Sequence, residues 1–360
     1  MTHYQDNRKF QQAPFRVAFV LLPKFSSLTL SSLVEPLRIA NYCGGGELYH
    51  WTYVSADGTA VPGCSGYNID TEALSENFDA LDAVIVCGGW NAERYENDVL
   101  DRWLLNAARQ QIIIGAAEMG SYVLARAGLL SGYSATIHWH CRNAFCERYP
   151  DVDIRDQLFV IDRKRMTCAG GTACIDMMLH DIQERYGSAL ATEVAEQVIC
   201  AAPRESWQPQ REALQNDHGT VPKPLQQAID IMEANVERTF KIPQVAATLG
   251  LSQRKLERLF SKHFACSAVA FYRRVRLQRA RALLTQTDMS VLDICIASGF
   301  ASSSYFSKSY AEEFGLRPRD HRLAWPDSER SPHWPGLHST MSTGKRPIPD
   351  TSGRNHRGNL

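Results

Sequence analysis

Apolar residues in the first 200 positions alternate between short continuous runs and segments of helical period. The runs are Arg16–Leu22, Trp51–Val54, Ala83–Cys87 and Ile112–Gly115, with two shorter ones at Leu158–Ile161 and Met166–Cys168. The helical segments are Leu28–Tyr42, Val99–Arg109, Ala173–Tyr186 and Leu190–Cys200. Continuous apolar strands separated by helices predict a parallel β-sheet covered on both faces.

The pattern changes after residue 201. Residues 202–221 are polar and rich in proline, which predicts a linker. Beyond it, helical period dominates, and an imperfect repeat appears in which Ala246, Gly250, Leu256, Phe260 and Phe264 recur as Cys295, Gly299, Phe306, Tyr310 and Phe314. Each copy reads as a short helix, a glycine turn, a serine-rich cap and a second helix. This order predicts two helix-turn-helix units, at about 242–263 and 291–314.

Length and composition complete the outline. A chain of 360 residues exceeds what a single core usually supports, so two domains are expected. Residues 1–14 are polar and residues 326–360 are poor in aliphatic side chains, and we expect both segments to be disordered. No apolar run reaches the roughly 18 residues of a membrane span, and no secretory signal precedes the first strand, so we expect a cytoplasmic protein without a membrane partner. The ten cysteines form no CxxC pair, and we expect no metal and no cofactor.

Charge is distributed unevenly along the chain. Residues 1–221 carry 18 basic and 27 acidic side chains, whereas residues 222–325 carry 16 and 9. The basic part is therefore expected to meet a polyanion. The outward faces of the two second helices supply the expected DNA-binding residues, which are Gln253, Arg254, Lys255, Arg258, Ser303, Ser304, Ser307 and Lys308. The segment Phe271–Leu284 reads as an amphipathic helix with five arginines, which we expect to hold the two units about 34 Å apart in adjacent major grooves.

Residues 222–325 resemble the AraC-type DNA-binding domain. The matching stretches are Val245–Ser252, Leu256–Phe260, Ile294–Phe306 and Phe314–Pro318. Two positions depart from the family pattern: Lys308 replaces the usual arginine, and His321 replaces the usual aromatic residue.

The first 200 residues resemble the DJ-1/PfpI-like, flavodoxin-like domain of the GlxA-type subgroup of AraC regulators. The stretches that carry this resemblance are Val34–Asn41, Val86–Gly89, Leu124–Leu130, Ala135–Trp139 and Gly170–Leu179. The resemblance implies an α/β DJ-1/PfpI-like domain over residues 15–201, followed by an all-α domain of two helix-turn-helix units over residues 222–325. Within the subgroup, the likeness is greatest to activators that sense glycine betaine, carnitine or related amino-acid-like metabolites.

The resemblance also locates a site. Enzymes with this domain place a cysteine on a sharp strand-to-helix turn, which here is Gly115–Gly120, with Glu118 in the nucleophile position. A carboxylate is a poor nucleophile, and His138, which matches the family's histidine, has no thiol to activate. We therefore expect no catalytic residue, no enzyme activity, and a pocket kept for sensing.

Five residues are expected to line this pocket: Glu35, Trp90, Glu118, His138 and Trp139. The enzymes have a glutamate facing the nucleophile, which would place Glu35 beside Glu118; the alternative is a carboxylate on a helix surface. Trp90 follows a strand's carboxyl end, where α/β sheets bind ligands, but it could be a surface aromatic. A tryptophan in the place of Trp139, next to His138, more often packs in the core. Carboxylates beside aromatic faces suit an ammonium or quaternary ammonium group.

Three functions follow from these features. The first is a metabolite-responsive transcriptional regulator that binds a betaine-like or amino-acid-like cation, forms a homodimer, and activates a catabolic operon through RNA polymerase. The alternative is a DJ-1-type hydrolase or amidase fused to a DNA-binding domain, against which Glu118 argues. The third is a constitutive repressor whose first domain is purely structural. A ligand-dependent thermal shift would separate the first from the third.

Overall fold

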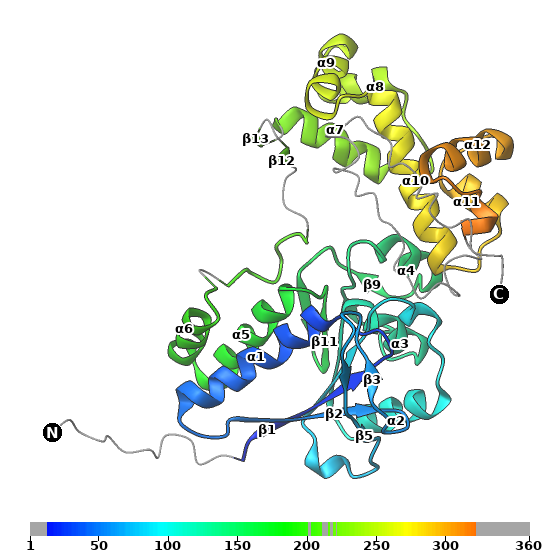
Figure 1. Cartoon of the computed structure of the whole chain (residues 1–360). Coiled ribbons are helices and arrows are strands. Elements are labelled where there is room, and N and C mark those ends of the chain that lie inside the picture. Colours follow the sequence, from blue (N-terminus) through cyan, green and yellow to red (C-terminus); the bar gives the residue numbers. More distant parts are fainter. Residues whose placement is uncertain (1–12, 201–202, 211–214, 217–218, 221, 322–360) are drawn as a thin grey trace, which may run out of the picture. The chain divides into compact units, whose positions relative to one another are not determined.

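The computed structural model describes residues 13–200, 203–210, 215–216, 219–220 and 222–321. The chain divides into two compact units, residues 1–211 and residues 212–360, which are coloured blue to green and green to orange in Figure 1. The segments expected to be disordered, 1–14 and 326–360, lie outside the described residues except for residues 13 and 14.

A seven-stranded sheet forms the centre of the first unit, in the order β10-β11-β7-β6-β1-β2-β5. Its strands are β1 (Phe15–Leu21), β2 (Tyr49–Ser55), β5 (Glu72–Ala73), β6 (Ala83–Cys87), β7 (Ile113–Ala117), β10 (Phe159–Asp162) and β11 (Arg165–Cys168). All neighbouring pairs are parallel except β10 and β11. The prediction of a parallel sheet is therefore wrong at this edge, because the two residues between β10 and β11 permit only a hairpin.

Shorter elements flank the sheet. Two-stranded pairs are formed by β3 (Val61–Pro62) with β4 (Asn68–Ile69) and by β8 (Ser134–Ala135) with β9 (Asp153–Ile154). The 3₁₀ turns are η1 (Phe78–Ala80), η2 (Ala92–Arg94) and η3 (Glu118–Gly120). The turns η2 and η3 follow β6 and β7, so both lie at the carboxyl edge of the sheet.

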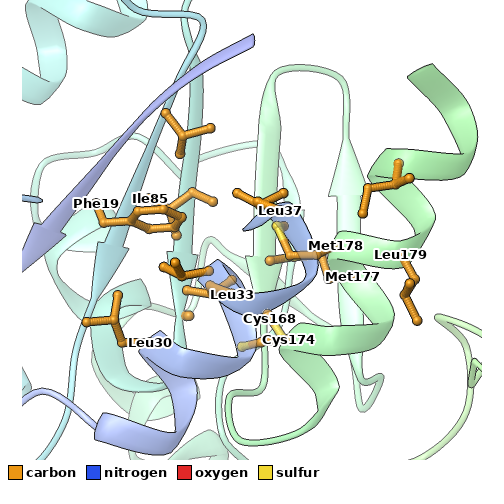
Figure 2. Close-up of a cluster of buried hydrophobic side chains, with 14 of the residues drawn as sticks. Phe19, Leu30, Leu33, Leu37, Ile85, Cys168, Cys174, Met177, Met178 and Leu179 are labelled. Atoms are coloured by element: carbon orange, nitrogen blue, oxygen red, sulfur yellow. The ribbon is translucent and has the colours of Figure 1, made fainter. Parts of the chain in front are cut away.

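Helices cover both faces of the sheet. One face packs against α1 (Ser27–Gly44), α5 (Ala173–Tyr186) and α6 (Ser188–Gln197), and the other against α2 (Asp98–Arg109), α3 (Ser121–Arg126) and α4 (Arg142–Arg148). Along β1, Phe19 enters the first core and Val20 the second, which explains why the strand is apolar at every position from Val17 to Leu21. Figure 2 shows Leu33 and Leu37 of α1 beside Met178 of α5. The predicted fold class is confirmed.

From residue 222 to residue 321, the second unit is helical. Its helices are α7 (Lys223–Ala234), α8 (Ile242–Thr248), α9 (Gln253–Phe264), α10 (Ala268–Gln286), α11 (Val291–Ala297) and α12 (Ser303–Phe314). Serine hydroxyls cap α9 and α12: Ser252 accepts from the Lys255 N–H and Ser302 from the Tyr305 N–H. Gly250 and Gly299 take positive φ angles at the two turns, a backbone conformation that favours glycine. The pairs α8–α9 and α11–α12 are therefore two helix-turn-helix units.

Helix α10 differs from the predicted amphipathic spacer, because its buried residues do not lie on one face but are distributed around much of the helix. Some of its arginines bind the protein itself. Arg276 donates to the carbonyl oxygens of Ser298 and Gly299 at 3.1 and 3.0 Å, and its guanidinium lies 3.9 Å from the centre of the Phe300 ring. Arg274 pairs with Glu313 of α12. These two cations fix α10 to the second helix-turn-helix.

The segment between the units also differs from its prediction. Residues 203–210, which we call the strap, are hydrogen-bonded to the first unit although the sequence predicted a linker from residue 202. After it, β12 (Gln215–Asn216) pairs with β13 (Gly219–Thr220) in a short hairpin. None of the helices in the described part of the chain has the length and hydrophobicity needed to cross a membrane.

Candidate functional site

Glu118 lies on a sharp turn between β7 and α3. Its φ angle is +58°, in the left-handed region that side-chain-bearing residues seldom adopt. Glycines make room for this turn: a Cβ on Gly120 would come within 2.2 Å of the Val86 oxygen, and one on Gly170 within 2.8 Å of the Glu118 Cβ. Three chain segments therefore close tightly around one carboxylate.

Helix α1 supplies the partner of this carboxylate. The Thr29 hydroxyl donates to Oε2 of Glu118 at 2.7 Å and accepts the Gly171 N–H at 2.8 Å. Burial raises the pKa of Glu118, and hydrogen bonds from the hydroxyls of Thr29 and Ser26 partly offset that rise. The sequence analysis did not identify Thr29. The sequence feature that could have indicated Thr29 is a hydroxyl residue on the buried side of a helix, close to the apolar residues Leu30 and Leu33.

Glu35 does not take the place expected for it. Its side chain is half exposed, and its carboxylate forms a 2.7 Å ion pair with Arg38 one turn along α1. Thr29 and Glu35 are six residues apart, which places them on different sides of the helix. The prediction that Glu35 lies beside Glu118 is therefore wrong, and its alternative as a surface carboxylate is correct.

Three buried cysteines surround the base of the turn. Cys174 and Cys168 have their sulfur atoms 3.5 Å apart, and Cys87 ends β6. Burial raises the pKa of the Cys87 and Cys174 thiols, and the negative charge of Glu118 raises both further. These thiols are therefore protonated at neutral pH and are poor nucleophiles. Among the described residues, no group of three or more His, Cys, Asp or Glu side chains is arranged to hold a metal ion.

His138 and Trp139 lie on the segment next to the turn. Ser121, three residues after Glu118, donates to the Thr136 carbonyl at 2.9 Å, which places this segment against the start of α3. Burial lowers the pKa of His138 to about 4, so its imidazole is neutral at pH 7. Its ring centre is 5.4 Å from that of Trp139, which is 36% exposed. A neutral imidazole beside a partly exposed indole does not repel a cation.

Trp90 follows β6, and β6 is the sheet neighbour of β7, which ends at Ala117, one residue before Glu118. The two residues therefore lie at the same carboxyl edge of the sheet. The Trp90 side chain is 39% exposed. This edge combines the buried carboxyl of Glu118, the neutral imidazole of His138 and the partly exposed indoles of Trp90 and Trp139.

The two recognition helices present the residues expected to bind DNA. On α9, the side chains of Gln253, Arg254, Lys255 and Arg258 are exposed; on α12, those of Ser303, Ser304 and Lys308 are exposed, and Ser307 is half-buried. The apolar faces of both helices, with Phe260 and Phe306, are buried. One polar face of each helix is thus available to a major groove.

Tyr305 was missed by the sequence analysis. It is 51% exposed in the first turn of α12, and its phenol accepts a hydrogen bond from Arg273 of α10, which lowers the pKa of Tyr305. The only signal in the sequence is a tyrosine one position before the buried Phe306. His321 is 7% exposed, contacts Phe314, and is 2.9 Å from the Tyr310 hydroxyl, so it packs like the aromatic residue that it replaces.

Comparisons with known proteins agree with this architecture. Residues 15–184 match the model of the DJ-1/PfpI family, and residues 245–324 match that of a helix-turn-helix domain. The HTH-type transcriptional regulator GbdR of Pseudomonas aeruginosa is 42% identical over 313 residues, covering 87% of this chain and 85% of its own. CdhR of the same species is 39% identical, covering 86% of this chain and 91% of its own.

A solved structure, that of an AraC family transcriptional regulator from Pseudomonas putida, is 31% identical and covers 51% of this chain and all of its own, with a TM-score of 0.48. The chain belongs to the AraC-family, GlxA-type transcriptional regulators, which join a DJ-1/PfpI domain to a DNA-binding domain of two helix-turn-helix units.

Proposed function

We propose that the first unit binds a small cationic effector at the edge that holds Glu118, and that this binding controls the DNA-binding unit. The observation that carries the proposal is the residue at the turn itself. A carboxylate occupies the strained position where enzymes of this fold place a thiol, and hydroxyls from α1 orient it. Backbone strain that the surroundings maintain is typical of functional sites.

The chemistry of this edge favours a ligand with a positive charge. The side chains of Trp90 and Trp139 are 39% and 36% exposed, and a cation over an indole face gains roughly 0.5–2 kcal/mol. Neutral His138 adds no opposing charge. A betaine-like or amino-acid-like cation, as the family resemblance implies, satisfies these conditions.

The alternative function, hydrolysis, has less support. A hydrolase of this fold needs a thiolate at the turn, and the neighbouring thiols of Cys87 and Cys174 are buried and protonated. Glu118 accepts hydrogen bonds from the hydroxyls of Thr29 and Ser26, and a carboxylate is a poor nucleophile. We therefore propose that the protein is a regulator without enzymatic activity.

A thermal-shift titration tests the proposed ligand class. Full-length protein is heated with glycine betaine, with carnitine, and with 3,3-dimethylbutanoate, in which carbon replaces the quaternary nitrogen. A ligand at 100 times its Kd stabilises a fold by about 2.7 kcal/mol, which raises Tm by several degrees. We expect the cations to shift Tm and the carbon analogue to leave it unchanged.

Glu118→Gln and Glu35→Gln form a matched pair for this titration. The first removes the buried negative charge and keeps the shape, and we expect it to weaken the effector about tenfold or more. The second removes an exposed carboxylate and should change nothing. Equal effector affinity in wild type and Glu118→Gln would contradict the proposal, as would an equal shift by the carbon analogue.

Activation of a catabolic operon, contact with RNA polymerase, homodimerisation and the occupation of two adjacent major grooves stay predictions. So do the individual DNA-binding roles of the residues on α9 and α12. Each follows from the family resemblance or from the repeat, and each needs a solution measurement.

A further inference from the structure

The strap joins the two loops that border the Glu118 edge. At its first end, the Arg204 backbone and guanidinium donate to both carboxylate oxygens of Asp176 at 2.7–3.0 Å. Asp176 is 2% exposed and lies in the first turn of α5. Arg204 also donates to the Thr172 hydroxyl at 3.0 Å. One end of the strap is thus fixed by charge-assisted hydrogen bonds, the strong kind.

The second end of the strap is fixed by a single glutamine. The Gln210 amide nitrogen lies within 3.0 Å of the Thr136 hydroxyl and of the carbonyls of Ile137 and Gln157, and its oxygen accepts the Trp139 N–H at 2.7 Å. Between the ends, the Leu158 N–H donates to the strap carbonyls of Ser206 and Gln208. The strap therefore holds the segment that carries His138 and Trp139.

These anchors connect to Glu118 through consecutive residues. The Thr29 hydroxyl, which donates to Glu118, accepts the N–H of Gly171, and the next residue, Thr172, accepts Arg204. Trp139, on the other side, lies next to His138. A ligand-induced change at Glu118 would thus reach the strap through Thr29 and the segment Gly171–Thr172. A change at Trp139 would reach it through the hydrogen bond from the Trp139 N–H to Gln210.

The strap is held by polar contacts with little apolar burial. Trp207, its one large apolar side chain, is 64% exposed. A segment held in this way docks or releases as a unit of low local stability. Release would add eight residues to the chain between the units, which is roughly 26–29 Å of additional reach.

We propose that the strap is the element that transmits effector binding to the DNA-binding unit: the effector orders its two anchor loops, and the docked strap shortens the connecting chain. The proposal rests on the proposed function, because it assumes that an effector binds at the Glu118 edge. By linkage, effector binding and strap docking favour each other to the same extent.

Hydrogen–deuterium exchange of the full-length protein tests the coupling without any ligand. The Leu158 amide reports docking directly, since its acceptors belong to the strap. We expect this amide to be protected in wild type, and to exchange roughly tenfold faster in Arg204→Ala. The control Arg163→Ala, which breaks an exposed pair with Asp162, should leave it unchanged.

Thr29→Val then perturbs the other end of the connection. We expect faster exchange at Leu158 in Thr29→Val and wild-type exchange in Thr29→Ser, which keeps the hydroxyl. A fast Leu158 amide in wild type would overturn the proposal. So would a Thr29→Val variant that loosens Gly171 and leaves Leu158 protected.

A final arm adds glycine betaine to the wild-type protein. Increased protection at residues 136–139 and 170–172 together with the strap supports the proposal, and protection at the loops without the strap overturns it. If glycine betaine protects none of these segments, it is not the effector. The coupling between the Glu118 edge and the strap is then tested by the Thr29 variants alone.

Discussion

At the scale of single residues, Glu118 occupies a conformation that costs a side-chain-bearing residue about 1–3 kcal/mol. Thr29 holds its carboxylate, and Gly170 can approach it only because it lacks a Cβ. The strained backbone and these contacts fix the direction of one carboxyl group at the edge of the sheet, where we propose that the effector binds.

A second buried carboxyl gives a prediction about pH. Glu93, in η2, is 2% exposed, its Oε2 has no hydrogen-bond partner, and burial raises its pKa to about 7. The pKa of Glu93 is near 4.5 in the unfolded chain and about 7 in the folded protein. Folding stability therefore falls as the pH rises through this range, and the loss of stability is complete above about pH 7. Glu93→Gln should therefore stabilise the protein by up to roughly 3 kcal/mol at pH 8 and hardly at all at pH 4.5.

Thermal unfolding of wild type, Glu93→Gln and Glu35→Gln between pH 4.5 and 8 measures this difference. Glu35 is exposed and serves as the control. A Glu93→Gln stability difference that is independent of pH would contradict a buried, titrating Glu93.

Arg254 gives a prediction about DNA. It is exposed in the first turn of α9, where an arginine can form two hydrogen bonds to a guanine edge. Arg254→Ala should cost about 1–3 kcal/mol on the preferred duplex and less on random duplexes. Fluorescence anisotropy measures both, with Arg319→Ala as a control on an exposed arginine outside the two helix-turn-helix pairs, α8–α9 and α11–α12. An equal loss on both duplexes would make Arg254 a phosphate contact.

At the scale of elements, α10 acts as the internal support of the second unit. Arg276 binds two carbonyl oxygens at the turn between α11 and α12. Arg276→Ala leaves those oxygens without their charged donor and should destabilise the unit by about 2 kcal/mol or more. Urea denaturation measures this, and Arg276→Lys, which keeps one donor, should recover part of the loss. Wild-type stability in Arg276→Ala would refute this supporting role.

The longer strands and helices were predictable, because each depends on a local pattern, whereas short elements such as α3, α4 and β8 were not predicted. The apolar run of β1 and the repeat around Gly250 and Gly299 indicate their structures without reference to distant residues. The partners of polar side chains were not predictable in this way. Thr29, and not Glu35, lies beside Glu118, and Arg276 donates to backbone carbonyl groups. Neither arrangement produces a periodic pattern in the sequence, because contacts between distant residues determine both.

The linker shows the same limit. Its proline and polar residues correctly indicated that no helix or long strand forms over residues 203–210. They did not indicate docking, because the strap is held by Arg204 and Gln210 through contacts with residues 28 to 74 positions away. A segment without regular structure can be well ordered when its polar groups find buried partners, such as Asp176.

At the scale of the whole molecule, the first part of the chain is acidic and the second part is basic. The acidic first part does not attract DNA, and the basic second part does. Binding should weaken steeply with salt, because phosphate contacts release counterions. Replacing one phosphate-contacting cation, as in Lys308→Gln, should reduce the slope of log K against log salt by about one. An unchanged slope would place Lys308 away from the phosphates.

The central proposal for this protein is that an effector at the Glu118 edge controls DNA binding. Anisotropy of a fluorescent promoter duplex, at fixed salt and with glycine betaine titrated in, measures that control directly. We expect the effector to change the Kd of wild type for DNA at least threefold, roughly 0.6 kcal/mol or more. Glu118→Gln should bind DNA with wild-type affinity in the absence of effector and should need about ten times more effector for the same change. Identical effector responses in wild type and Glu118→Gln would contradict the account.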